Sequence, residues 1–159
     1  MQAVEVVEQL YRVFSARDWR AMRELYHPSA LIFTVTGGPA PLAANEIVAE
    51  LERAASEVMY SVHGEPPVAL DEHAVIIVGR MRRGMPRGGF EDAGHVWLLT
   101  VRDELIYRQG VYRSTEEAAA AYRQHGVSLG MGEEESPGAV TGHVQKSPLK
   151  QMRPAPGEG

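Results

Sequence analysis

The stretch "HVWLLTVRDELIYRQGVYRSTEEAAAAY" (residues 95–122) contains, in order, two strand patterns and one helix pattern. Apolar and β-branched residues dominate 93–102 and 105–113, and the polar "RDE" between these runs is typical of a turn. Thr115 then opens an alanine-rich run with acidic residues in its first turn, and this run ends at Gly126. Together these patterns predict an antiparallel hairpin followed by a capped helix.

Two further strand patterns precede this hairpin. One covers about residues 58–70 and is interrupted by "EPP"; the other covers 74–82 and is joined to the hairpin by "RGMPRGG". A sheet of long strands needs a bulge or bend in order to curl, and Gly79 and Gly94 are the candidate positions. We therefore expect a curled sheet that is mainly antiparallel.

The first third of the chain supplies helices. Apolar residues recur at helical spacing over residues 4–14, and Asp18 is the expected N-cap of a second helix, which ends before Pro28. A short strand pattern at 31–35 follows, and then a third helix capped by Asn45. The order α-α-β-α-β-β-β-β-α predicts an α+β domain, in which helices pack on the concave side of a cone-shaped, curled sheet.

The composition changes after residue 126. Residues 127–159 are rich in Gly, Pro and Ser and show no sustained periodicity. Such a segment buries too little surface to offset its ordering entropy. We expect one domain over 1–126 and a disordered tail over 127–159.

Composition also limits the function. The net charge of −5 argues against a nucleic-acid partner, which would favour a basic face. No run approaches the roughly 18 apolar residues of a membrane span, and the N-terminus lacks the leading positive charge of a signal peptide. The chain has no cysteine, and its histidines lack short metal-ligand spacing. We expect a cytoplasmic protein without metal, cofactor or membrane partner.

The segments "YRVFSARDWRAMRELYHPSALI" and "HVWLLTVRDELIYRQGVYRSTEEAAAAY" resemble the SnoaL-like branch of the NTF2-like superfamily. The likeness spans roughly residues 3–125. It rests on Asp18 and Trp19 after the first helix and on the final hairpin ending in "VYRSTEEA". The resemblance implies a homodimer with a small-molecule pocket between sheet and helices. Members include polyketide cyclases, ketosteroid isomerase, limonene epoxide hydrolase, scytalone dehydratase and proteins without a known reaction.

The resemblance argues against ketosteroid isomerase itself. The aspartate base of those enzymes falls on or near Thr34, their oxyanion tyrosine near Leu10, beside Tyr11, and their protonated aspartate near Trp97. None of the three is retained at its matched position. That chemistry needs a carboxylate base and two donors aimed at a developing enolate, so ketosteroid isomerase is excluded.

Strand alternation assigns side chains to the two faces of the sheet. On 93–101, His95 and Trp97 share one face, and Val96 and Leu98 share the other. The resemblance places the Trp97 face inward. Because both faces are apolar, we expect a partner subunit to cover the outer one, giving a homodimer through the outer sheet face. The expected inward residues of the neighbouring strands are Val75, Ile77, Gly79 and Met81, and Ile106, Arg108, Gly110 and Tyr112.

Three residues are candidates for catalysis. His95 is the best of them, because histidine titrates near neutrality, although it could equally bond to a neighbouring strand. His27 could face the pocket mouth or cap the second helix. Asp92 lies three residues before His95, so the two share a face only if Gly94 bulges the strand.

Two function classes remain open. The first is a protein that binds a small apolar molecule and has no assignable reaction. The second is a cofactor-free acid–base enzyme: a cyclase, isomerase, dehydratase or epoxide hydrolase. Epoxide hydrolysis uses an Asp–Arg–Asp set in this superfamily, and the spacing of Arg80, Asp92 and Asp71 does not identify them as one. Sparse inward carboxylates favour binding. The candidate ligand-binding residues are Trp97, Tyr112, Tyr60, Met81, Arg108 and Thr34.

Overall fold

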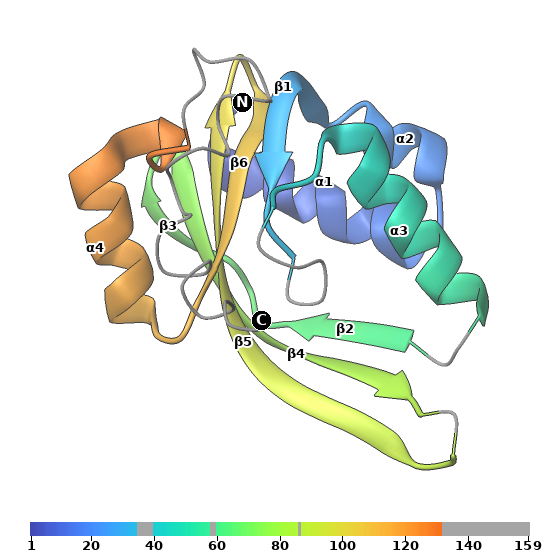
Figure 1. Ribbon diagram of the computed structural model, residues 1–159. Coiled ribbons are helices and arrows are strands. Elements are labelled where there is room, and N and C mark those ends of the chain that lie inside the picture. Colours follow the sequence, from blue (N-terminus) through green and yellow to red (C-terminus); the bar gives the residue numbers. More distant parts are fainter. Residues whose placement is uncertain (35–39, 58–59, 86, 132–159) are drawn as a thin grey trace, which may run out of the picture.

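The computed structural model describes residues 1–34, 40–57, 60–85 and 87–131 (Figure 1). Its elements in chain order are α1 (Ala3–Ser15), α2 (Trp19–Arg23), β1 (Tyr26–Ile32), α3 (Ala44–Glu57), β2 (Tyr60–Gly64), β3 (Val68–Asp71), β4 (Ala74–Gly84), β5 (Phe90–Arg102), β6 (Leu105–Tyr112), α4 (Thr115–His125) and a 3-10 turn (Gly126–Ser128). Within the described ranges no helix is long and apolar enough to cross a membrane.

The strands form one sheet in the order β1-β6-β5-β4-β2, with β3 also paired to β4. Every pairing is antiparallel except that of β1 with β6. The long β4–β5 hairpin curls toward α3, and α1, α2 and α3 lie on the concave side (Figure 1). This α+β arrangement confirms the predicted cone-like fold.

The curl does not come from a bulge at Gly79 or Gly94, so the bulge alternative of that expectation is wrong, and a bend at these glycines stays a prediction. The β4–β5 register runs unbroken from Ala74 opposite Thr100 to Gly84 opposite Phe90. Alternation therefore holds along β4 and β5, as predicted. Val75, Ile77, Trp97, Leu99 and Val101 pack in one core with α1 and α3.

The register shift lies instead between β5 and β6. Val101 pairs with Ile106, whereas its neighbour Thr100 pairs with Arg108, so Tyr107 is an extra residue. One extra residue moves every later side chain to the other face. Tyr112 accordingly packs in the outer core rather than the inner one. The inward placement of Arg108, Gly110 and Tyr112 was wrong, because it assumed a regular strand.

The outer face of the sheet is covered by the chain itself. α4 lies on the opposite side of the sheet from α1, α2 and α3 (Figure 1). The sheet residues Ala74, Ile76, Val96 and Leu98 form one core with Ala118 of α4 and with Leu129 and Met131. Two side-chain hydrogen bonds add to this contact, from Tyr122 Oη to Asp71 Oδ2 (2.8 Å) and from Thr100 Oγ1 to the Val127 carbonyl (2.7 Å). Two apolar faces therefore do not by themselves require a partner subunit.

The beginning of the predicted tail packs against the sheet. Leu129 and Met131 are only 7% and 4% exposed. Residues 132–159, which make up the rest of the predicted tail, lie outside the described residues.

β1 begins earlier than the pattern at 31–35 predicted. α2 ends at Arg23, and Tyr26 already pairs with Ile106 of β6. Pro28 was expected to end a helix, but it lies inside the strand. It is tolerated there because β1 is an edge strand whose register shifts between Tyr26 and Leu31.

Candidate functional site

A cavity of about 460 Å³ lies between the helices of the concave side and the sheet. Its walls are mostly apolar, with Leu10 and Phe14 from α1, Ile47 and Leu51 from α3, Ile77 from β4 and Leu99 from β5. Its polar lining residues are Tyr11, Tyr26, Thr34 and Gln109, together with the charged Glu50, Arg53 and Arg83. Cavities of this size and character are typical of small-molecule sites.

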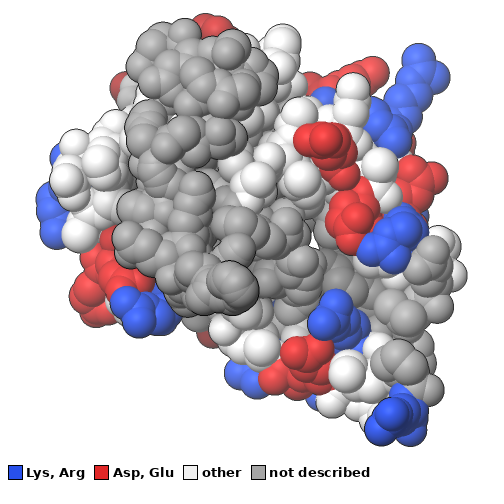
Figure 2. All heavy atoms as spheres, in the orientation of Figure 1, with Lys and Arg blue, Asp and Glu red and all other residues white. Residues whose placement is uncertain are grey.

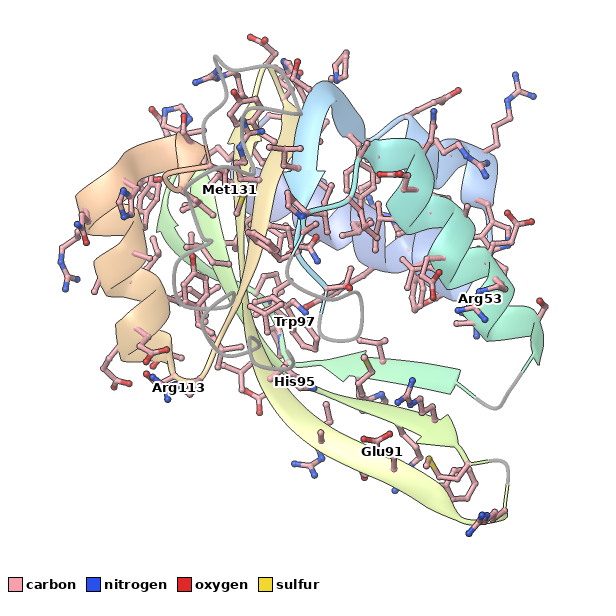
Figure 3. All side chains as sticks on the ribbon, in the orientation of Figure 1. Arg53, Glu91, His95, Trp97, Arg113 and Met131 are labelled. Carbon is pink, nitrogen blue, oxygen red and sulfur yellow. The ribbon has the colours of Figure 1, made fainter. Side chains whose placement is uncertain are left out.

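The charged residues of the cavity wall are paired. Arg53 donates to Glu50 within α3, and Arg83 Nε donates to Glu91 across the β4–β5 hairpin at 3.0 Å. Arg53 lies on α3 and Glu91 on the β4–β5 hairpin, with β2 between these two elements (Figure 3). Acidic and basic residues are interspersed on this part of the surface (Figure 2). Among the described lining residues, acidic and basic side chains therefore occur together.

Tyr11 spans from α1 to β2. Its hydroxyl donates to the Glu65 carbonyl at 3.1 Å, and burial raises the pKa of Tyr11 to about 12. A Cβ placed on Gly64 would lie 2.6 Å from this hydroxyl oxygen. The absence of a side chain at Gly64 is therefore what lets Tyr11 form this part of the wall.

The ring of Trp97 packs directly against a second glycine, Gly79. A Cβ on Gly79 would lie 3.1 Å from Trp97 Cζ3. The ring of His95 lies beside that of Trp97, with 5.5 Å between centroids (Figure 3). Trp97 lines the cavity, whereas His95 is not among its lining residues. Burial lowers the pKa of His95, so the neutral imidazole predominates at neutral pH.

The structure does not bring the three catalytic candidates together. Asp92 lies on the opposite face of β5 from His95, because Gly94 does not bulge. Its carboxylate accepts from Arg80 Nε (3.1 Å) and Arg82 Nη2 (3.0 Å), and these bonds, that of Arg82 first, hold the pKa of Asp92 below its usual range. The predicted dyad is absent.

His27 is engaged away from the cavity. Its Nδ1 accepts from the Ser29 backbone N–H at 3.0 Å, and its Nε2 lies 3.4 Å from Asp103 Oδ2. The ring packs edge-on against Tyr107, with 5.1 Å between centroids. Neither His27 nor Asp92 is among the cavity-lining residues.

The predicted ligand-binding residues divide into three groups. Trp97, Met81 and Thr34 line the cavity. Arg108 and Tyr112 do not: Arg108 is fully buried, stacks 3.9 Å from the Tyr107 ring centroid and donates to the Ser29 carbonyl at 2.9 Å. The backbone of Tyr60 begins β2, but its side chain lies outside the described part.

The sequence reasoning missed the charged lining residues Glu50, Arg53 and Arg83 and three uncharged polar residues of the cavity. Gln109 follows Arg108, so the expected inward position of Arg108 implied that Gln109 faces outward; the extra residue Tyr107 turns Gln109 inward. Tyr26 was read as part of a helix, and Tyr11 as part of the apolar face of the first helix, without a role in the site. The helical spacing of Leu10, Tyr11 and Phe14 was the one sequence signal for the position of Tyr11. It places all three on the face of α1 that lines the cavity.

The sequence matches no protein-family model and no curated protein. Solved structures do match the fold. An NTF2-like protein from Burkholderia thailandensis aligns with 21% identity and a TM-score of 0.62, over 76% of this chain and 96% of that one. A Mycobacterium tuberculosis protein, solved in complex with estradiol-17β-hemisuccinate, aligns with 13% identity and a TM-score of 0.60, over 73% and 97%. A candidate polyketide cyclase from Xanthomonas campestris aligns with 20% identity and a TM-score of 0.54, over 73% and 93%.

At these identities the likeness shows the fold alone. This chain has the NTF2-like fold, and its solved neighbours include proteins assigned to polyketide cyclisation. The predicted resemblance is confirmed at that level.

Proposed function

We propose that this protein binds a small, largely apolar molecule in the cavity between α1, α3 and the sheet. The observation that carries this proposal is the cavity itself: about 460 Å³, mostly apolar walls and a few polar side chains. Burying apolar ligand surface supplies affinity, and a small number of polar groups supplies orientation. The Mycobacterium tuberculosis protein of the same fold, solved with a steroid derivative, supports this proposal.

Binding is favoured over acid–base catalysis by the character of the lining. Among the described lining residues the one carboxylate is Glu50, which is paired with Arg53. His95, the expected proton-transfer group, does not line the cavity. A general base has to lie within hydrogen-bond reach of the proton that it removes. The cyclase, isomerase, dehydratase and hydrolase alternatives therefore have less support.

Filling the cavity tests the proposal. Ala54 of α3 lines the cavity, whereas the adjacent Ala55 does not. For Ala54→Trp we expect the affinity for a neutral aromatic probe, 2-acetylnaphthalene, to fall about tenfold or more, which is about 1.4 kcal/mol. Isothermal titration calorimetry measures this affinity directly.

Ala55→Trp is the matched control, because it adds the same ring to the same helix outside the cavity. Equal affinities of the two variants would contradict the assigned site. A wild-type protein that does not bind the probe at millimolar concentration would contradict the function.

We also retain the homodimer and the cytoplasmic location as proposals. We place the proposed dimer surface beside α4 rather than across the whole outer face, because Ala74, Ile76, Val96 and Leu98 already pack with α4. Val68 and Leu70 of β3 stay 60% and 37% exposed. We expect the protein to sediment as a dimer at micromolar concentration and Val68→Asp to sediment as a monomer. A wild-type protein that sediments as a monomer under these conditions would contradict the proposed homodimer.

A further inference from the structure

Tyr26 lies in the deeply buried part of the cavity wall. It is the first residue of β1, it pairs with Ile106, and it is 6% exposed. It belongs to the inner core and also lines the cavity. The strand pairing holds its backbone, and burial in the inner core restricts its ring.

The Tyr26 hydroxyl has no hydrogen-bond partner within the described residues. Other tyrosine hydroxyls are engaged: Tyr11 donates to the Glu65 carbonyl, and Tyr122 donates to Asp71. A buried hydroxyl almost always finds a partner. Because Tyr26 lines the cavity, that partner is available from the molecule or water that occupies it.

The surroundings determine which ligand group suits this hydroxyl. Burial raises the pKa of Tyr26 above its usual value, so the phenol keeps its proton and presents an O–H donor. Met22 and Leu99, which line the same cavity and belong to the same core as Tyr26, are apolar, and an uncompensated charge in such surroundings is costly. A neutral oxygen acceptor satisfies both conditions.

Building on the proposed function, we propose that Tyr26 is the hydrogen-bond donor that recognises an uncharged carbonyl oxygen of the ligand. The ligand class is then an apolar molecule with a ketone, ester or similar carbonyl, bound with that oxygen toward Tyr26. Neither carboxylates nor ammonium groups are accepted at this end. Tyr26 thereby orients the ligand within walls that are mostly apolar.

Two probes that differ at one group test the assignment. The probes are 2-acetylnaphthalene and 2-ethylnaphthalene, which share the ring system and differ in the carbonyl oxygen. We measure the ratio of their affinities for the wild-type protein and for Tyr26→Phe, which keeps the ring and removes the hydroxyl. The wild-type preference for the ketone is expected to fall about tenfold in the variant, as loss of one buried hydrogen bond implies.

Controls separate this inference from the proposed function. Tyr112→Phe removes a hydroxyl from the outer face, so its affinity ratio should equal that of the wild type. A Tyr26→Phe ratio equal to the wild-type ratio, with both probes bound, would overturn the role of Tyr26 and leave the binding function intact. A drop in the ratio for Thr34→Val but not for Tyr26→Phe would move the recognition to Thr34, whose Oγ1 also lacks a partner among the described residues. Failure of the wild type to bind either probe would overturn both proposals.

Discussion

Replacing Gly79 by alanine is expected to lower the free energy of unfolding by about 1–3 kcal/mol, the usual cost of inserting atoms into a packed interior. A Cβ at this position would lie 2.5 Å from the His63 carbonyl oxygen and 3.1 Å from Trp97 Cζ3. The first neighbour is backbone of the adjacent strand, so it cannot move without disturbing the β2–β4 pairing. The second is a wall of the cavity, so probe binding should weaken as well.

Gly94→Ala is the matched control for this substitution. Gly94 is also a strand glycine, but the nearest atom to its Cβ would be Arg80 Nη1 at 3.4 Å, the end of a flexible and exposed side chain. Removing a strand glycine recovers roughly 0.5–1 kcal/mol of chain entropy, so we expect unchanged or slightly higher stability. Urea unfolding followed by circular dichroism measures both variants. Equal stability of Gly79→Ala and Gly94→Ala would show that Trp97 and β2 do not pack on Gly79 as described.

The sheet was predictable from the sequence wherever strands are regular. The strand from His95 to Val101 pairs without interruption, so alternation puts Trp97 and Leu99 on one face, and the family resemblance implied that this face is the inner one. The same reasoning gave the wrong faces for the side chains of β6, because nothing in the sequence indicates that Tyr107 is an extra residue. A shift of one residue moved Gln109 into the cavity and Arg108 out of it.

The candidate site was predictable only in part, for a related reason. Thr34, Met81 and Trp97 line the cavity as expected. The place of Tyr26 in the cavity wall was not predicted, because a proline two residues later suggests the end of a helix rather than an edge strand. Strand alternation also does not predict which side chains of a face reach the cavity. His95 lies on the same face of β5 as Trp97 but does not line the cavity. Alternation gives a side of the sheet, and the cavity occupies only part of that side.

The sequence also did not predict that α4 packs on the outer face of the sheet. An apolar outer face indicates that something packs on it, but a partner subunit and an internal helix leave the same pattern in the strands. α4 has the composition of a solvated helix, with few large apolar residues. Its contact is made by Ala118, with Ala119 and Tyr122 partly buried beside it, and by two residues beyond its end, Leu129 and Met131.

Ending the chain at residue 126 rather than at residue 131 is therefore expected to lower the free energy of unfolding by about 2–4 kcal/mol. The shorter chain loses the burial of Leu129 and Met131, which are 7% and 4% exposed. It also loses the hydrogen bond from Thr100 Oγ1 to the Val127 carbonyl. Each fully buried side chain of this size contributes about 1.5–3 kcal/mol, and that figure is an upper bound because the unfolded chain already buries some surface.

Both truncated chains lack residues 132–159, so their difference reports on the five residues alone. Thermal unfolding of the two chains measures it, and in the full chain the double variant Leu129→Ala, Met131→Ala should change stability in the same direction. Equal melting temperatures of the two truncated chains would mean that these residues belong to the tail after all. A lower melting temperature for the shorter chain would place the end of the folded domain at or beyond Met131, because the outer core formed with Ile76 and Leu98 is incomplete without these residues.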